Sequence, residues 1–278
     1  MAFIFSDSMN NNTTSSSPIG VFDSGVGGLS VWRELVKFLP DEDIIYVADS
    51  ANCPYGNKSQ KEVIELSNRI ALFLLEKGCK LIVVACNTAT AAAIDYLRKH
   101  YSIPFVGMEP AVKPAALSSK TRAVGILATA GTFKGHLFNE TKERFASDVK
   151  VIEQVGEGLV DAVENGTADS PETKRLLQSY IQPMLDANVD HIVLGCTHYP
   201  FLIPQIKEIA KDRIVIIDPA PAVAKHVKHL LEENGLGGKT KDFISPTYSF
   251  YTTGDPAILQ RMLGDLNVKN YTAEKIIL

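Results

Sequence analysis

The segment that decides the fold, residues 81–90, reads Leu-Ile-Val-Val-Ala-Cys-Asn-Thr-Ala-Thr. Its first five residues are apolar without alternation, which is the pattern of a parallel strand covered on both faces. An alanine-rich helix is predicted to follow, with Asn87 or Thr88 as its cap. Cys86 would then stand between the carboxyl end of a strand and the N-terminus of a helix. Open α/β sheets bind ligands at that place, and the helix dipole there favours thiolate over thiol.

A second segment repeats this pattern. Residues 191–200 read His-Ile-Val-Leu-Gly-Cys-Thr-His-Tyr-Pro, and Cys196 lies 110 positions after Cys86 (196 − 86 = 110). Short strands predicted at 20–25 and 125–132 are separated by a similar distance, and both end in small and hydroxyl residues. We interpret the chain as two related α/β halves, each with a strand that ends in a cysteine. If the halves face each other about a pseudo-twofold axis, the two thiols flank one cleft.

Strands and helices alternate along the whole chain, so the predicted class is α/β with largely parallel sheets. Strands are expected at 18–22, 43–48, 81–85, 103–108, 122–128, 149–154, 191–195 and 213–217, with an edge strand at 243–252. Helices are expected at 29–39, 59–78, 87–100, 133–146 (capped by Thr132), 156–165, 171–187, 201–209, 220–233 and 255–265. Ser59 and Glu62 have the spacing of a capping box. Residues 1–17 are rich in Ser, Asn and Thr and are expected to form a flexible N-terminal extension with no packing role.

Composition limits the functional classes. The 278 residues are 45% hydrophobic and 22% charged, which is typical of a globular protein, and the net charge of −4 argues against nucleic acid as the main partner. We expect no membrane partner, because no apolar run reaches the length of a span and the start lacks the features of a secretory leader. The four cysteines, Cys53, Cys79, Cys86 and Cys196, have no zinc spacing and are too few for a disulfide framework. A cytoplasmic location with reduced thiols and no bound metal is therefore expected.

The glycine-rich turn at residues 23–28, Asp-Ser-Gly-Val-Gly-Gly, precedes a predicted helix and could hold an anion. It fits neither the dinucleotide fingerprint nor the Walker sequence, so it does not indicate a nucleotide cofactor. The candidate functional residues also have structural explanations. Cys86 and Cys196 could be ordinary buried cysteines, Asp23 a turn residue and His198 a structural histidine. The repeat and its polar flanks favour a function for the two cysteines, whereas Cys53 and Cys79 lack such flanks and are interpreted as structural.

Five segments together resemble the glutamate racemases, members of the aspartate/glutamate racemase family. They are residues 22–31, Pro54-Tyr55-Gly56, Cys86-Asn87-Thr88-Ala89, Glu109-Pro110 and Cys196-Thr197-His198-Tyr199-Pro200, in the family's order between residues 19 and 221. The His-Tyr-Pro that follows Cys196-Thr197 favours glutamate over aspartate.

The resemblance implies an isomerase that interconverts L- and D-glutamate by a two-base mechanism without any cofactor. It implies a role in peptidoglycan synthesis, and so in cell wall biogenesis and cell shape. It also implies two α/β domains, residues 18–110 plus 219–278 and residues 111–218, with the active site in the cleft between them. Glutamate is then the small-molecule partner. A homodimer is compatible with the resemblance, and the oligomeric state stays open.

Racemisation removes the α-proton on one face of an amino acid and returns a proton on the other. Without the electron sink of pyridoxal phosphate, two bases on opposite faces are the simplest solution, and thiols with an ordinary pKa near 8.5 suit the task once tuned. Cys86 and Cys196 are the candidates. The resemblance implies that Asp23 assists Cys86, and that Glu164 and His198 assist Cys196. Glu164 is matched to the family's acidic residue although residues 154–159 replace a Cys-Pro found in many members, and Glu157 is the nearby alternative.

The resemblance also implies a set of substrate-binding residues that offer short donors and acceptors: Asp23, Ser24, Tyr55, Gly56, Asn87, Thr88, Thr197 and His198. Tyr55 and Gly56 would meet the side-chain carboxylate, partly through backbone N–H groups. No Arg occurs in these motifs, so anion binding would depend on N–H groups and helix termini. Several of these residues could instead serve only as helix caps or turn residues.

Two functions of other classes stay open. Cys86 and Cys196 could form a reversible disulfide in a thiol redox protein, although such pairs are usually close in sequence. The chain could also be a binding or regulatory protein of the same fold. Formation of D-glutamate from L-glutamate without an added cofactor would distinguish the racemase from both.

Overall fold

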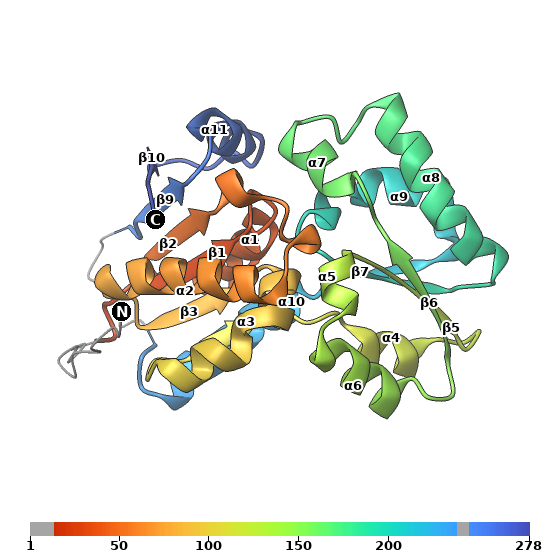
Figure 1. Ribbon diagram of the computed structural model, residues 1–278, viewed down its shortest axis with the longest axis horizontal. Helices are drawn as coiled ribbons and strands as arrows, with labels where there is room; N and C mark the ends of the chain where they lie inside the picture. The colour runs from red at the N-terminus through yellow and green to blue at the C-terminus, as the bar shows by residue number, and fades with distance from the viewer. Residues whose placement is uncertain (1–13, 238–244) are drawn as a thin grey trace.

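The computed structural model describes residues 14–237 and 245–278, which form two parallel sheets side by side (Figure 1). The first sheet has the strand order β10-β9-β2-β1-β3-β4 and the second β6-β5-β7-β8, and every strand pair is parallel. The first sheet contains β1 (Ile19–Asp23), β2 (Ile44–Ala48), β3 (Leu81–Val84), β4 (Phe105–Gly107), β9 (Tyr248–Thr252) and β10 (Tyr271–Lys275). The second contains β5 (Ala123–Ala128), β6 (Lys150–Val155), β7 (His191–Gly195) and β8 (Val215–Ile217). The predicted α/β class with parallel sheets is confirmed.

The predicted repeat appears in the strand order. The order β2-β1-β3-β4 in the first sheet matches β6-β5-β7-β8 in the second, so β3 corresponds to β7. Cys86 follows the end of β3 and Cys196 follows the end of β7. The two cysteines therefore occupy equivalent positions in the two halves, at the carboxyl ends of central strands.

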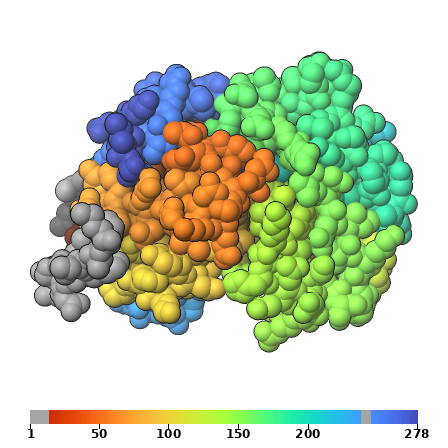
Figure 2. Space-filling model, viewed as in Figure 1, coloured from red at the N-terminus to blue at the C-terminus, as the bar shows by residue number. Residues whose placement is uncertain are grey.

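Helices cover both faces of each sheet. The first half holds α1 (Leu29–Phe38), α2 (Gln60–Glu76), α3 (Asn87–His100), α10 (Ala220–Glu233) and α11 (Pro256–Asp265). The second holds α4 (Val112–Ser118), α5 (Ala130–Phe133), α6 (His136–Phe145), α7 (Leu159–Glu164), α8 (Pro171–Asp186) and α9 (Ile203–Ala210). Helices α1 and α10 pack together on one face of the first sheet, and α2 and α3 pack on the other. The orange and green segments of the two halves meet along the middle of the molecule (Figure 2).

The C-terminal part of the chain returns to the first half, and there the sequence-based expectations need correction. The predicted edge strand at 243–252 is β9, which is internal because it pairs with both β2 and β10; residues 243–244 lie outside the described residues. The true edge, β10, was not predicted because its sequence, Tyr-Thr-Ala-Glu-Lys, is mostly polar and lies partly in solvent. Helix α4 was also missed. Its seven residues are too few to show a clear helical period.

Three expectations about helix termini were wrong and one is confirmed. The cap of α3 is the Cys86 thiol, which accepts a hydrogen bond from Ala89 N, and Asn87 is already inside the helix. The helix predicted at 133–146 is divided into α5 and α6, and Thr129 rather than Thr132 caps α5. The segment expected as one helix at 201–209 is a 3-10 turn, Tyr199–Leu202, followed by α9. Ser59 and Glu62 form the predicted capping box of α2.

The last residues of the N-terminal extension do have a packing role, contrary to expectation. Lys80 is fully buried, pairs with Glu42 at 2.6 Å, and donates a hydrogen bond to the carbonyl oxygen of Ser15 at 2.7 Å. The rest of the predicted flexible extension, residues 1–13, lies outside the described residues. Among the helices of residues 14–237 and 245–278, none is long and apolar enough to cross a membrane.

Candidate active site

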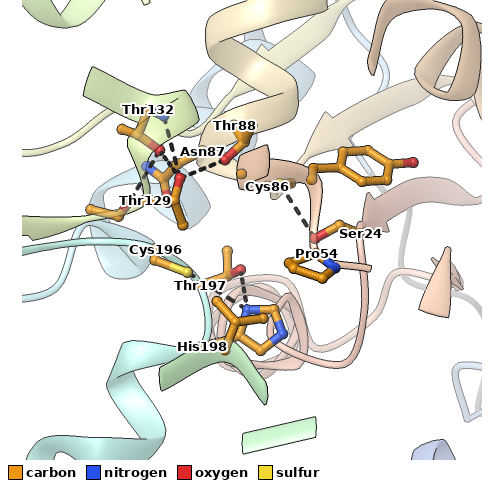
Figure 3. A pocket seen from close by; sticks show the side chains of 14 residues that line it. Ser24, Pro54, Cys86, Asn87, Thr88, Thr129, Thr132, Cys196, Thr197 and His198 are labelled. Atoms are coloured by element: carbon orange, nitrogen blue, oxygen red, sulfur yellow. Dashed lines mark hydrogen bonds between the residues drawn. The ribbon is translucent and has the colours of Figure 1, made fainter. Parts of the chain in front are cut away.

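A small pocket lies between the two halves, at the carboxyl ends of β1, β3 and β7. It has a volume of about 10 Å³, roughly the space in which one water molecule fits. Cys86 and Cys196 both line it, and they approach it from opposite sides (Figure 3). A larger hollow of about 310 Å³ adjoins it and shares Pro54, Gly56, Thr129 and Val160 with it. Because the inner pocket is so small, a substrate larger than water needs the two halves to separate before it can bind.

Cys86 is held at the N-terminus of α3. Its thiol donates to Ser24 Oγ at 3.7 Å, and its sulfur accepts from Ala89 N at 3.4 Å. Burial and the nearby Asp23 carboxylate raise the pKa of the Cys86 thiol to about 12, although the hydrogen bond from Ala89 N opposes the shift. The structure therefore holds Cys86 as a neutral thiol at neutral pH, in a position where hydrogen bonds can still support the thiolate.

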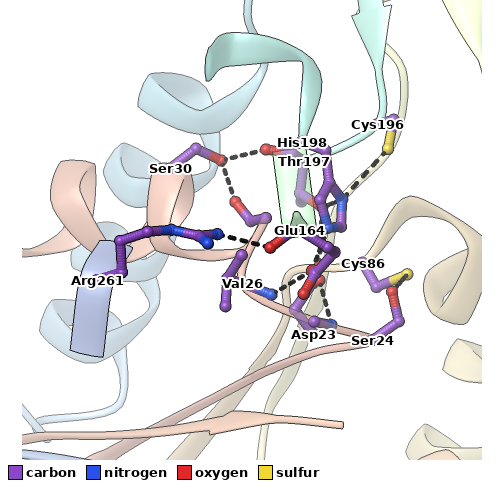
Figure 4. A network of polar contacts seen from close by, with 12 residues as sticks. Asp23, Ser24, Val26, Ser30, Cys86, Glu164, Cys196, Thr197, His198 and Arg261 are labelled. Atoms are coloured by element: carbon purple, nitrogen blue, oxygen red, sulfur yellow. Dashed lines mark hydrogen bonds and ion pairs between the residues drawn. The ribbon is translucent and has the colours of Figure 1, made fainter. Parts of the chain in front are cut away.

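Cys196 faces a buried ion pair. His198 Nδ1 lies 3.7 Å from Cys196 Sγ, and His198 Nε2 lies 2.7 Å from Glu164 Oε1 (Figure 4). Burial acts to lower the pKa of His198, but contacts with Cys196, Cys53 and Glu164 raise it well above its ordinary value. Burial acts to raise the pKa of Glu164, and its hydrogen bonds to His198 and to Val26 N bring that pKa below its ordinary value. The pair is therefore a carboxylate and an imidazolium, and an imidazolium beside Cys196 is a partner for its thiolate.

Asp23, at the end of β1, connects the two halves by a hydrogen bond beside the pocket. Its carboxylate accepts from Gly25 N at 2.9 Å and from Thr197 Oγ1 at 2.9 Å. Burial raises the pKa of Asp23, and the charge of His198 opposes this shift. The carbonyl oxygen of Thr197 accepts from Ser30 Oγ of α1 at 2.9 Å. These hydrogen bonds fix the segment that follows Cys196 against the first half.

The glycine-rich turn after β1 allows the ion pair to approach the first half. A Cβ added to Gly25 would stand 2.0 Å from Glu164 Oε1, and a Cβ added to Gly27 would stand 2.3 Å from His198 Nδ1. Real Cβ atoms do not come this close to other atoms. The glycines at these two positions are thus explained by the contact with Glu164 and His198, and no nucleotide phosphate is needed to explain them.

The other predicted binding residues lie around the same pocket. Asn87 Nδ2 donates to Met108 O at 3.2 Å, whereas Asn87 Oδ1 is buried and has no hydrogen-bond partner among the described residues. Thr88 Oγ1 and Thr129 Oγ1 are 2.8 Å apart and bridge the two halves. Tyr55 and Gly56 line the pocket, but the Tyr55 hydroxyl points away to Asp49 Oδ2 at 2.5 Å. Asn87 Oδ1 is therefore a buried hydrogen-bond acceptor, on a residue that lines the pocket, whose capacity is unused within the described residues.

The two candidate cysteines and most of the other predicted site residues line this pocket. Asp23 and Glu164 lie just behind it, where they contact Thr197 and His198. Of the two acidic alternatives, Glu164 contacts His198, and Glu157 is exposed. Sequence reasoning missed two neighbours. Cys53 lies beside Glu164 and His198, and Arg261 of α11 donates to the carbonyl oxygen of Glu164 at 2.6 Å (Figure 4). Cys53 could have been found from its place in a polar loop after β2, but the sequence around Arg261 contains no signal.

Comparisons with known proteins agree with this arrangement. The family model for Asp/Glu/Hydantoin racemases matches residues 19–227. A glutamate racemase of Roseiflexus sp. (strain RS-1) is 46% identical over 265 residues, which are 95% of this chain and 97% of that protein. Among solved structures, a glutamate racemase isoform of Bacillus anthracis aligns with a TM-score of 0.84 at 30% identity, covering 95% of this chain and 98% of the other. A glutamate racemase of Francisella tularensis in complex with D-glutamate aligns with a TM-score of 0.82 at 31% identity, covering the same shares.

The chain therefore belongs to the Asp/Glu/Hydantoin racemase family and has its two-domain α/β fold. It is an isomerase, and the relatives that it matches over nearly their whole length are glutamate racemases.

Proposed function

We propose that this protein interconverts L- and D-glutamate, with Cys86 and Cys196 as the two acid–base groups and without a cofactor or metal. One observation carries the proposal: two thiols at equivalent strand ends line one pocket from opposite sides. The similarity to glutamate racemases, one of them in complex with D-glutamate, supports glutamate as the substrate.

The proposed mechanism gives each thiol its own partners. For L-glutamate, Cys196 takes the α-proton while the Cys86 thiol gives its proton to the opposite face; for D-glutamate the roles reverse. The imidazolium of His198, held by Glu164, stabilises the Cys196 thiolate. The high pKa of Cys86 supports a resting form in which Cys86 is protonated, and this is the form that L-glutamate requires.

Asp23 acts on the Cys86 side in this proposal. Its negative charge adds to burial in raising the pKa of Cys86, and so favours the protonated Cys86 thiol in the resting enzyme. Asp23 is thus proposed to adjust Cys86 by charge, since Cys86 itself donates to Ser24.

Substrate binding is proposed to use the short polar groups of both halves. The orphan Asn87 Oδ1 accepts from the α-ammonium, and the hydroxyls of Ser24, Thr88 and Thr197 serve the α-carboxylate and ammonium. The side-chain carboxylate meets the backbone at Tyr55 and Gly56, because the Tyr55 hydroxyl is already bound to Asp49. A buried acceptor without a hydrogen-bond partner destabilises the protein, and an ammonium group bound there would supply the missing hydrogen bond.

We also propose the domain bounds 18–110 plus 219–278 and 111–218. The membership of the strands in the two sheets supports these bounds, as does the packing of α10 on α1 and of α4 on α6. D-glutamate would serve peptidoglycan synthesis and so cell wall biogenesis. The cytoplasmic location and the homodimer remain predictions.

A racemisation assay tests the proposal. Purified protein that has been treated with a chelator and dialysed free of pyridoxal phosphate is expected to convert L-glutamate to D-glutamate. The loss of optical rotation measures this conversion. Loss of activity on chelation or on removal of pyridoxal phosphate, in protein that stays folded, would contradict it. Titration of free thiols before and after turnover separates the racemase from a redox protein, which would consume two thiols per cycle.

A further inference from the structure

Three side chains next to the pocket carry three different metal-binding atoms. Cys53 Sγ, a carboxylate oxygen of Glu164 and a ring nitrogen of His198 all lie within 4.8 Å of one another. They come from the loop after β2, from α7 and from the segment after β7. Glu164 and His198 are buried and Cys53 is partly buried. The proposed mechanism uses Glu164 and His198 but gives no task to Cys53.

Packing fixes these three groups against one another. The Cβ position of Gly25 is 3.1 Å from Cys53 Sγ and 2.0 Å from Glu164 Oε1, so both atoms crowd the same backbone turn. The sulfur of Cys53, a carboxylate oxygen of Glu164 and a ring nitrogen of His198 therefore stay within 4.8 Å of one another without any ion present. The cluster is thus preformed, and its members need only small shifts to share one ion.

We propose that Cys53, Glu164 and His198 form an inhibitory binding site for Zn²⁺ or a similar soft divalent cation. One thiolate, one imidazole nitrogen and one carboxylate oxygen are ligands that Zn²⁺ takes in proteins, and three protein ligands leave one position for water. With bonds of about 2.0–2.3 Å, tetrahedral ligand atoms lie roughly 3.3–3.8 Å apart. This is inside the 4.8 Å span of the cluster. Mg²⁺ and Ca²⁺ prefer all-oxygen sites and do not suit this donor set.

Binding would release the proton of the Cys53 thiol and one proton of the His198 imidazolium, and no electron is transferred. The ion would then occupy the Glu164 carboxylate and a His198 nitrogen that now pair with each other at 2.7 Å. His198 could no longer be the imidazolium partner of Cys196. This inhibitory consequence rests on the proposed function, whereas the binding itself does not.

Binding is tested on the full-length, reduced and chelator-treated protein with CoCl₂ as the probe. We expect one equivalent of Co²⁺ to give a thiolate-to-cobalt charge-transfer band that ZnCl₂ abolishes. The band should be lost in Cys53→Ala and kept in Cys79→Ala, the matched control, because Cys79 is buried away from the cluster. It should also be kept in Cys86→Ser. A band that survives in Cys53→Ala, or disappears in Cys86→Ser, would assign the metal to the thiols of the pocket and overturn the proposal.

Inhibition is tested by racemisation of L-glutamate at increasing ZnCl₂, with each variant compared with its own metal-free rate. The half-inhibitory concentration is expected to rise at least about tenfold in Cys53→Ala and to stay unchanged in Cys79→Ala, consistent with the loss of one of three ligands. Equal inhibition of both variants would overturn the inhibitory role. The metal-free rate of the unaltered protein tests the proposed function separately, so the two failures can be told apart.

Discussion

Glu164 Oε1 lies 2.7 Å from His198 Nε2, and the same oxygen accepts a hydrogen bond from Val26 N, also at 2.7 Å. One carboxylate therefore stabilises the protonated form of His198 beside Cys196, and it also connects the second half of the molecule to the first. Charged groups buried in this way are expensive unless they are paired. The contact between the two halves and the protonation of His198 therefore both depend on Glu164.

The first prediction concerns pH and stability in Glu164→Gln. The pKa of Glu164 is lowered from 4.5, so its contribution is present above about pH 4.5 and is lost as the pH falls through the lowered value. The pKa of His198 is raised from 6.5, so its contribution is full below about pH 6.5 and is lost as the pH rises through the raised value. Both contributions are complete between about pH 4.5 and pH 6.5. In that range Glu164→Gln should reduce the free energy of unfolding most, by about 3 kcal/mol.

Urea unfolding at a series of pH values checks this window. Glu172→Gln is the matched control, because that carboxylate is exposed and pairs with Arg175 of its own helix. The control should change little at any pH. A loss in Glu164→Gln that is the same at every pH would show that the ion pair is not its source.

The second prediction concerns the glycine-rich turn. A methyl group at Gly27 would stand 2.3 Å from the His198 ring, so Gly27→Ala must displace the ring from its present position beside Cys196. A misplacement of about 1 Å costs on the order of 10² in rate, and we expect a fall in kcat of this size. Gly264→Ala is the control, because Gly264 lies in α11 with open space around its Cβ position. Steady-state kinetics of the two variants that showed equal kcat values would refute this explanation of the glycine.

The third prediction concerns the choice of substrate. If the backbone at Tyr55 and Gly56 receives the side-chain carboxylate, the shorter L-aspartate leaves that hydrogen-bonding place unfilled. We expect kcat/KM for L-aspartate to be lower than for L-glutamate by a factor of at least about 10², since a site built to bind a polar group discriminates strongly against its loss. Parallel racemisation assays with the two amino acids measure this ratio. Comparable values would remove the assignment to glutamate.

Much of the fold could be predicted from the sequence, because most strands are continuous runs of apolar residues that are followed by turn-forming or helix-capping residues. Residues 81–90 and 191–200 indicated both central strands and both cysteines, and the repeat predicted two related halves, which the matching strand orders confirm. The edge strand β10 could not be predicted, since a strand paired on one side needs few apolar residues. Thr129 as a cap was missed because several hydroxyl residues stand together there, and only the backbone direction selects one of them.

Site residues were predictable where a reactive side chain lies at or just after the end of a strand. They were less predictable where the site depends on contacts between the two halves. Asp23 is the last residue of β1, and Cys86, Cys196 and His198 closely follow β3 or β7. Glu164 stands at the end of a short helix, and its choice over Glu157 depended on the resemblance. Cys53 and Arg261 reach Glu164 only through tertiary contacts across more than 90 positions of sequence. No local pattern records such contacts.

The last prediction concerns the two faces of the substrate. In the two-base scheme each thiol is the base for one enantiomer and the acid for the other, so replacing either should abolish racemisation in both directions. A half-reaction can survive the replacement. A glutamate analogue whose β-leaving group departs after deprotonation needs only one base, and its elimination therefore reports on each thiol alone. Both cysteines line the same pocket, so both can reach the analogue once the halves have opened.

With Cys86→Ser, elimination from the L-isomer should persist because Cys196 and its His198 partner remain, 3.7 Å apart. Elimination from the D-isomer should fall by a factor on the order of 10² or more, the contribution of a positioned base. Cys196→Ser should show the opposite preference. The rates of both variants with both enantiomers are to be measured, with circular dichroism as the check of folding. If each variant lost both enantiomers equally while folded, the thiols would not be independent bases on opposite faces, and a single shared base would have to replace them.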